Sequence, residues 1–527
     1  MMSSRIPAMR NQTLITLSVF VFAICLAWQL AQQITLNNIR TLTFAAAGFV
    51  GVSVAITILR NWRSGFYLFF VWMLFEDLFR KYMGNGLALF FGKDILIALV
   101  YISLFVAIRR GREKRFRPRF LLCLGFFFLL GVLQVFNPNS PHILYGLLGF
   151  KTYFYYIPLM YVGYALIRND EDLRKFLVFN AALSGLIAAL GIAQAILGNS
   201  FLNPANLAPE LKDLGNLEKF TPLTNQLFSL PDSVFVSSGR FALFLILAFI
   251  LALGASGYLL LTQLRGRKIV FSAIAVIGVA TLLSGNRGAV IFVLISAVSL
   301  TAVLLWGAPW RHRQAHRMLK AIRRSVIVSA TGLALILLVF PQEAGSRIAY
   351  YTETLLPSSF AYELGNRSWD YPFRNLTDSF SRPNWVLGNG IGTASIGMQY
   401  VAKITGRPIP ELWVEEGFGV LIVEMGIIAP FLWILWTGAL LYHGWGMVSR
   451  LRQTRFFPIS FAIFWYIFLL LYPMTFGGLS AYQNYINNIY LWLLVGILFR
   501  LPEIQASAPS LLQLPSPKKR TRGGFQF

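Results

Sequence analysis

The sequence predicts an all-α membrane protein that crosses the bilayer many times, and three observations carry this prediction. First, 56% of the 527 residues are hydrophobic and only 13% are charged, a composition far more apolar than that of a soluble domain. Second, apolar runs of roughly the 20 residues that span a bilayer recur along the chain. Third, strongly basic segments separate several of these runs, as is typical of cytoplasmic loops. We therefore expect the lipid bilayer to be a partner.

The apolar runs predict about 12–14 transmembrane helices. The first run is long enough to span the membrane itself, and no small-residue cleavage site follows it, so we expect it to be retained. The third run is short enough to be re-entrant. The expected spans are residues 14–31, 42–59, 65–79, 87–107, 120–136, 150–167, 175–197, 240–262, 269–283, 288–306, 325–340, 417–441, 456–474 and 485–500.

The net charge of +25 is explained by topology. The main basic clusters all fall on one side of the membrane if the N-terminus is cytoplasmic, as the positive-inside rule requires. These clusters are RRGREKRFRPR at 109–119, RGRK at 265–268, RHRQAHRMLKAIRR at 311–324 and KKRTR at 518–522. Contact with anionic lipid headgroups accounts for the remaining excess, so we expect no nucleic-acid partner. The prediction is a multi-pass protein of the inner (plasma) membrane, with both termini cytoplasmic.

This topology divides the chain into four parts. Residues 1–341 would hold the first eleven helices with short loops, and residues 342–416 would form an external (periplasmic) loop subdomain. Residues 417–500 would hold the last three helices. Residues 501–527 are rich in Pro and Ser and then basic, which predicts a disordered cytoplasmic tail. Residues 198–239 form a second hydrophilic loop, which is expected on the external side.

An arginine, Arg287, lies where the ninth apolar run ends and the tenth begins, in the sequence SGNRGA. The small polar residues around it predict a tight turn, and the backbone N–H groups that open the next helix favour anions. A guanidinium there can bind phosphate oxygens in a bidentate manner. The alternative is an interfacial arginine that only reaches to the headgroups. A diphosphate that leaves from a lipid-linked sugar would suit this position, because positive charge stabilises the leaving group.

The large external loop offers further candidate binding residues. Arg367 and Arg374 are seven residues apart, so they would share a face if this segment is helical. Trp369 between them could stack on a sugar ring or anchor the loop at the interface. Lys151, at the outer end of the sixth run, could contact a donor or reach to the headgroups. The GNGIG sequence at 388–392 lacks the setting of a nucleotide loop and predicts a turn with close backbone approach.

Three glutamates follow the loop. Glu415 lies just before the twelfth apolar run and could act as a general base towards a sugar hydroxyl. Interface polarity, or pairing with the loop arginines, is the alternative for Glu415 and Glu416. Glu424 lies inside the apolar run, and we expect it to have a structural partner there.

Four motifs in this order resemble the O-antigen ligase and polymerase superfamily of bacterial membrane glycosyltransferases: SGNRGA, NRSW, GNGIGT and VEMGIIA. The resemblance covers about residues 280–435. It implies a fold like that of C-type membrane glycosyltransferases and an inverting reaction that needs no metal, nucleotide or other cofactor. It also implies that Arg287 grips the donor diphosphate and that Arg367 belongs to the same site. The family's ligases carry a histidine nine residues before the Glu of an E-x-G element; that Glu is Glu424 here, and Glu415 takes the place of the histidine.

The missing histidine favours a polymerase-type transferase of surface polysaccharide or exopolysaccharide, with Glu415 as the base. Its partners would be a polyprenyl-diphosphate-linked glycan donor, a glycan acceptor and other polysaccharide-assembly proteins, and its site would face the external side. Ligase-type transfer to a lipid-core acceptor stays open. A transporter or flippase of lipid-linked oligosaccharides also stays open, because four charged residues lie in or near the third and fourth runs: Glu76, Asp77, Lys93 and Asp94.

Overall fold

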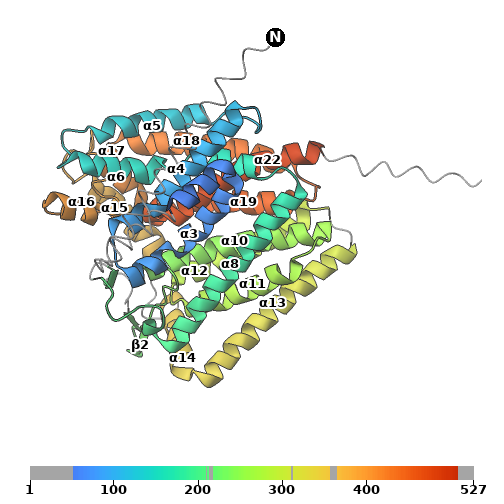
Figure 1. Ribbon diagram of the computed structural model, residues 1–527. Helices are drawn as coiled ribbons and strands as arrows, with labels where there is room; N and C mark the ends of the chain where they lie inside the picture. Colours follow the sequence, from blue (N-terminus) through green and yellow to red (C-terminus); the bar gives the residue numbers. More distant parts are fainter. Residues whose placement is uncertain (1–50, 209–210, 213–217, 310–311, 357–364, 508–527) are drawn as a thin grey trace, which may run out of the picture. The chain divides into compact units, whose positions relative to one another are not determined.

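The computed structural model describes residues 51–208, 211–212, 218–309, 312–356 and 365–507 (Figure 1). The predicted span at 14–31, the first part of the span at 42–59 and residues 508–527 of the predicted tail lie outside the described residues. Within these ranges almost all regular structure is helical, which agrees with the predicted all-α class.

The first half of the described chain contains a helix at Gly51–Arg60, followed by α3 (Trp62–Met83), α4 (Leu87–Arg109), α5 (Leu121–Val135), α6 (Ile143–Phe154), α7 (Leu159–Leu166), α8 (Asp170–Leu197) and η1 (Asn199–Phe201). Two short strands, β1 (Glu218–Phe220) and β2 (Leu227–Ser229), then form an antiparallel hairpin in which Lys219 pairs with Phe228.

The second half contains only helices as regular structure. They are α10 (Ser238–Thr262), α11 (Arg267–Leu283), α12 (Arg287–Gly307), α13 (His312–Val339), α14 (Pro341–Leu355), η2 (Asn366–Asp370), α15 (Tyr371–Ser379), α16 (Met398–Thr405), α17 (Gly417–Met425), α18 (Ile428–Arg450), α19 (Phe457–Leu469), η3 (Leu470–Met474), α20 (Thr475–Gly477), α21 (Ser480–Gln483) and α22 (Tyr485–Ser507). The predicted loop at 342–416 therefore contains helical segments of its own.

Six helical segments among the described residues are long and apolar enough to cross a membrane: Leu89–Arg109, Asp170–Leu197, Ser238–Thr262, Arg287–Gly307, Phe457–Gly477 and Tyr485–Ser507. They support residence in a membrane. Several other predicted spans are not single long helices. The run at 120–136 forms α5 of only 15 residues, and the run at 150–167 is divided between α6 and α7, with Pro158 at the junction.

The predicted span at 417–441 is also wrong as a single helix. It breaks after Met425, and the next helix begins at Ile428 and continues to Arg450. Gly426 lies at the break with a φ of +84°, and a Cβ there would lie 2.4 Å from the carbonyl oxygen of Val386. Only glycine adopts this positive φ without strain and leaves room for the Val386 carbonyl group. The last helix, by contrast, runs to Ser507, so residues 501–507 of the predicted tail are helical.

The described chain divides into two units. The smaller unit contains residues up to Phe70 together with Asp94–Ala107. In it, the Ser103 hydroxyl donates a hydrogen bond to the carbonyl oxygen of Leu59 at 3.2 Å. The larger unit contains Val71–Lys93 and all residues from Ile108 onward, and it holds every feature discussed below.

Helix α10 is the central element of the larger unit. It packs against α8, α11, α12, α19 and α22, and 89% of its apolar window is buried, against 33% for α12. Helices α7 and α22 approach each other closely, because glycines lie at their contact. A Cβ on Gly163 or on Gly496 would lie 2.0 Å from a carbonyl oxygen of the other helix, which is the small-residue packing typical of membrane helices.

Candidate functional site

A cavity of about 620 Å³ lies where the beginnings of α10 and α12 meet the segment from η3 to α21. Its charged lining residues are Lys219, Arg287, Arg367 and Glu415, and we call it the cationic cavity. Part of its wall is apolar and comes from the first turns of the two membrane helices, at Leu243, Ile246, Ile291 and Phe292. The cavity therefore offers a polar end and an apolar side to one ligand.

Arg287 is the first residue of α12, as the sequence predicts. The turn before it is tight, since Gly285 has a φ of +65° and the Ser284 hydroxyl accepts a hydrogen bond from the backbone N–H of Asn286 at 3.2 Å. Asn286 caps the helix, and its side chain accepts from the N–H of Ala289 at 3.0 Å. The Arg287 guanidinium lies 5.2 Å from the centre of the Tyr350 ring. These contacts fix the start of α12 at the wall of the cavity.

A second helix N-terminus reaches the same cavity. Gly239, in the first turn of α10, lines it, and Ser237 caps this helix by accepting from the N–H of Arg240 at 3.3 Å. Each helix N-terminus carries about half a positive charge. The polar end of the cavity is therefore electropositive. Among the described lining residues, two helix N-termini and three cationic side chains face one carboxylate.

Sequence reasoning did not single out Lys219, which reaches the cavity from strand β1. Its ammonium group donates to the Tyr350 hydroxyl at 3.2 Å and lies 5.1 Å from the centre of that ring. Tyr350 thus contacts both Lys219 and Arg287. No local sequence pattern predicts this contact, because Lys219 and Tyr350 are 131 residues apart in the sequence.

Two charged residues of α14 hold the hairpin that carries Lys219. The buried guanidinium of Arg347 donates to the carbonyl oxygen of Ser229 at 2.8 Å, and burial lowers the pKa of Arg347 to about 10. The Glu353 carboxylate accepts from the N–H of Leu223 at 2.7 Å and from the Thr224 hydroxyl at 2.9 Å. Because these bonds involve charged groups, they are stronger than ordinary hydrogen bonds and fix the hairpin firmly.

Glu415 lies in the lining with Arg367, and the two form an ion pair at 3.7 Å. The Tyr371 hydroxyl donates to the Glu415 carboxylate at 2.6 Å, and the Arg367 guanidinium lies 4.7 Å from the centre of the Tyr371 ring. The hydrogen bond to Glu415 raises the pKa of Tyr371 above its usual value, so this tyrosine stays protonated at neutral pH. The side chain of Glu415 remains 43% exposed, which leaves its carboxylate accessible from the cavity.

The neighbouring Glu416 has a different role. It is buried and caps α17, where its carboxylate accepts from the N–H groups of Phe418 at 2.8 Å and Gly419 at 2.5 Å. Burial raises the pKa of Glu416 to about 7, although these two hydrogen bonds act in the opposite direction. The sequence offered interface polarity or arginine pairing as the alternative role for both glutamates, and the structure makes Glu415 a cavity residue and Glu416 a helix cap.

The remaining candidate binding residues lie outside the lining. Trp369 is exposed and packs against Phe373 and against Phe476, a lining residue, with ring centres 4.7 and 6.5 Å apart. Arg374 is exposed on α15 and is not among the residues that line the cavity, whereas Arg367, in the wide turn of η2, is. Lys151 lies on α6 with its ammonium group 4.6 Å from the ring centres of Phe90 and Phe91.

Glu424 has the structural partners that were expected of it. It is fully buried, and its carboxylate accepts from the Tyr153 hydroxyl at 2.8 Å, the Ser395 hydroxyl at 2.7 Å and the N–H of Ala394 at 2.8 Å. The GNGIG segment forms the predicted turn, with positive φ at its three glycines. Its backbone N–H groups at Asn389 and Gly390 donate to carbonyl oxygens of α17.

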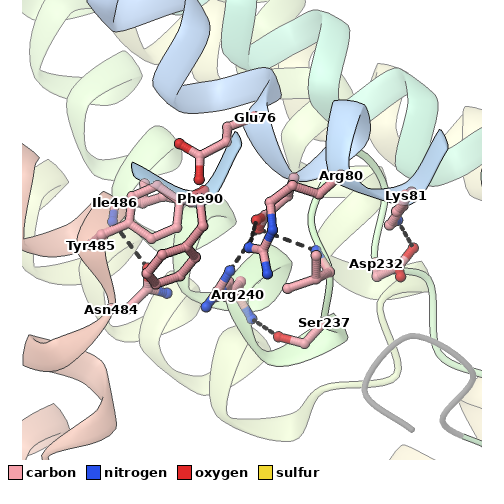
Figure 2. Close-up of polar contacts among 12 residues, drawn as sticks. Glu76, Arg80, Lys81, Phe90, Asp232, Ser237, Arg240, Asn484, Tyr485 and Ile486 are labelled. Atoms are coloured by element: carbon pink, nitrogen blue, oxygen red, sulfur yellow. Dashed lines mark hydrogen bonds and ion pairs between the residues drawn. The ribbon is translucent and has the colours of Figure 1, made fainter. Parts of the chain in front are cut away.

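A set of ion pairs lies next to the cavity wall, buried except for the partly exposed Arg240, and we call its members the ion-pair cluster: Glu76, Asp77, Arg80, Lys81, Lys93, Asp232 and Arg240. Asp77 pairs with Arg80 at 2.8 Å and with Arg240 at 2.7 Å. Lys93 pairs with Glu76 at 2.8 Å, and Lys81 pairs with Asp232 at 2.9 Å. Figure 2 shows Lys81 meeting Asp232, and Arg80 and Arg240 directed towards each other.

The ion-pair cluster fixes the start of α10. Besides binding Arg240, the Asp77 carboxylate accepts from the N–H of Val236 at 3.3 Å, in the segment that leads into this helix. The charges of the third and fourth apolar runs that suggested a transport path are therefore, at Glu76, Asp77 and Lys93, engaged with partners.

Within the described ranges, no group of three or more His, Cys, Asp or Glu side chains is placed to hold a metal ion. Comparison of the sequence with protein-family models and with curated proteins finds no match.

Proposed function

We propose that the protein is a membrane glycosyltransferase that transfers a glycan from a polyprenyl-diphosphate-linked donor to a sugar hydroxyl. The observation that carries the proposal is the convergence of Arg287, Arg367 and Glu415, from three separate segments, on one electropositive cavity with an apolar side. A lipid diphosphate has the same amphipathic character. Its phosphates match the helix ends and cations, and its isoprenoid chain matches the apolar residues of α10 and α12.

The reaction follows from this arrangement. The acceptor hydroxyl gives its proton to the Glu415 carboxylate while its oxygen forms a bond to the anomeric carbon of the donor. The bond from that carbon to the diphosphate breaks, and polyprenyl diphosphate leaves with the electron pair. Arg287 and Lys219, with the ends of α10 and α12, stabilise the negative charge that develops on it. Attack opposite the leaving group inverts the anomeric centre.

Arg367 and Tyr371 position the base in this scheme, since both contact the Glu415 carboxylate. The exposed aromatic rings of Trp369 and Phe373, beside Phe476, offer a surface on which a sugar ring can stack. In the polymerase-type reaction that we favour, the acceptor is another lipid-linked repeat unit. The protein would act in the inner membrane, with the cavity on the external side and with other polysaccharide-assembly proteins as partners.

The test uses the full-length protein in nanodiscs with a lipid-diphosphate-linked repeat unit from the source organism's envelope. The measured quantities are released polyprenyl diphosphate and glycan length. We expect Arg287→Ala to lower turnover by about 10²–10³-fold and Glu415→Gln to lower it by about 10²–10⁴-fold. The matched controls are Lys212→Ala and Glu411→Gln, exposed residues outside the lining. They should retain activity.

The outcomes separate the alternatives. Loss of turnover in Arg287→Ala with full activity in Glu415→Gln would remove Glu415 as the base. Transfer to a lipid-core acceptor without elongation would identify a ligase. Movement of the intact substrate across the bilayer without release of polyprenyl diphosphate would replace the transferase by a transporter.

A further inference from the structure

A second cavity, of about 480 Å³, lies at the far end of α22 from the cationic cavity. Arg115, Arg117 and Arg119 line it from the segment before α5, and Arg450 and His443 line it from α18. We call it the arginine cavity. Ser480 and Ala481, just before α22, line the cationic cavity, whereas Phe499 and Glu503 near its end line the arginine cavity. At 1.5 Å per residue, the two sites are about 30 Å apart, close to the thickness of the hydrocarbon core.

Positive charge gathers around the arginine cavity, because four arginines and one carboxylate line it. Its one acidic lining residue, Glu503, already forms ion pairs with Arg500 at 2.5 Å and with Lys114 at 3.4 Å. In the part of the chain that the structure describes, no carboxylate forms an ion pair with Arg115, Arg117, Arg119 or Arg450. Arginine presents a planar fork that matches phosphate oxygens, so four of them around one cavity favour a phosphate-bearing anion.

An exposed apolar surface adjoins this cavity. Helices α5 and α18 pack against each other, and both carry exposed apolar side chains close in sequence to the cavity residues. Leu122 on α5 is 71% exposed, and Tyr442 and Trp445 on α18 are 76% and 52% exposed. Tyrosine and tryptophan are typical of the membrane–water interface. A soluble anion would make no use of this surface, whereas the acyl chains of a lipid would cover it.

We propose that the arginine cavity binds the phosphate of an anionic glycerophospholipid, whose acyl chains lie along the exposed face of α5 and α18. This inference is independent of the proposed transferase activity, because it rests on other residues at the opposite end of α22. The bound lipid would join α5, α18 and α22 at the side of the membrane where the basic loops lie.

Native mass spectrometry of the full-length protein tests the proposal. Delipidated protein is mixed with phosphatidylglycerol or with phosphatidylcholine, and soluble glycerol phosphate serves as a competitor. We expect phosphatidylglycerol to bind at least about tenfold more tightly than phosphatidylcholine, since each basic side chain near an anionic lipid adds to the attraction. The triple variant Arg117→Ala/Arg119→Ala/Arg450→Ala should lose this preference.

The matched control removes the same charge from exposed residues outside the cavity, as Arg112→Ala/Arg265→Ala/Lys268→Ala, and it should bind like the wild type. The charge-preserving variant Arg117→Lys/Arg119→Lys/Arg450→Lys should recover part of the affinity, which shows that loss in the alanine variant does not come from misfolding. Equal binding of the two lipids, or equal loss in the control, would overturn the proposal. Full competition by soluble glycerol phosphate would assign the cavity to a water-soluble phosphate ester instead of a lipid.

Discussion

Two groups of charged side chains meet at the first turn of α10, and they are arranged in opposite ways. In the ion-pair cluster, Arg240 is partly buried and the other charged side chains are buried, and each of the three carboxylates faces a cation at 2.7–2.9 Å. In the cationic cavity, which begins one residue away at Gly239, the described lining holds three cationic side chains and one carboxylate, and the ion pair between Arg367 and Glu415 is longer, at 3.7 Å.

This difference indicates that the ion-pair cluster stabilises the fold and that the cationic cavity binds a ligand. Removing charges from water costs several kcal/mol per ion, so buried charges persist only with partners in good geometry. The ion-pair cluster meets that requirement by itself. The cationic cavity is more open, because the side chains of its Arg367–Glu415 pair are 53% and 43% exposed, and an anionic ligand can therefore approach its cations. The comparison therefore predicts loss of stability from changes in the cluster and loss of activity from changes in the cavity.

The largest effect on stability is expected from Asp77→Asn. This change takes the carboxylate away from Arg80, which is buried, and from Arg240, which is partly buried, and breaking such a buried pair typically costs about 3–5 kcal/mol. The apparent Tm of the purified protein in detergent measures the effect. Asp172→Asn, which breaks the exposed pair with Arg168, is the control and should cost less than about 1 kcal/mol. Similar Tm values for the two variants would contradict the structural role of the cluster.

A pH-dependent effect is expected from Glu416. Because its pKa in the folded protein is about 7, against 4.5 for an ordinary glutamate, the folded state holds a proton that the unfolded state has released between these pH values. Its contribution to stability is therefore complete below pH 4.5 and is lost as the pH rises through 7. Glu416→Gln should remove this loss of unfolding free energy, which is on the order of 1–3 kcal/mol. The Tm of the variant should therefore fall less steeply than that of the wild type between pH 5 and pH 8. An unchanged slope would show that Glu416 titrates normally.

A smaller effect on activity is expected from Tyr371→Phe. The variant loses the hydrogen bond that orients the Glu415 carboxylate, and a bond to a charged group contributes about 1.5–3 kcal/mol. We expect kcat to fall by roughly tenfold or more while KM stays within about twofold, since Tyr371 contacts the base and not the substrate. A change confined to KM would argue for direct substrate contact instead.

The smallest effect on stability is expected from Arg287→Ala. The arginine contacts Tyr350 through a cation–π interaction, which contributes about 0.5–1 kcal/mol at an accessible site. Its removal also lowers the excess charge of the cavity. Tm should therefore stay close to that of the wild type, even though turnover collapses. A loss of stability as large as that of Asp77→Asn would make Arg287 a structural residue.

Local patterns predicted those features that depend on neighbouring residues. The small residues around Arg287 predicted the turn and the helix that begins at this residue, and the glycines at 388–392 predicted the turn found there. The apolar runs predicted the long helices, but not the break at Gly426, which exists because another backbone segment, at Val386, approaches it.

Features that depend on distant contacts were missed. Lys219 reaches the cavity only because α14 holds its hairpin in place, and Lys151 lies against Phe90 and Phe91 instead of lining the cavity. The spacing of Arg367 and Arg374 predicted a shared face, but of these two residues only Arg367, in the wide turn of η2, lines the cavity. Neither tertiary contact nor helix irregularity is encoded in residue spacing.

The measurement that tests the central claim most directly is the affinity of the purified full-length protein for polyprenyl diphosphate, compared with polyprenol of the same length. It needs neither acceptor nor turnover. We predict that the diphosphate binds at least about tenfold more tightly than the alcohol. We also predict that Arg287→Ala removes this difference, while Lys212→Ala keeps it. Equal affinity for the two lipids in the wild type, or an unchanged preference in Arg287→Ala, would contradict the assignment of the cationic cavity as a diphosphate site.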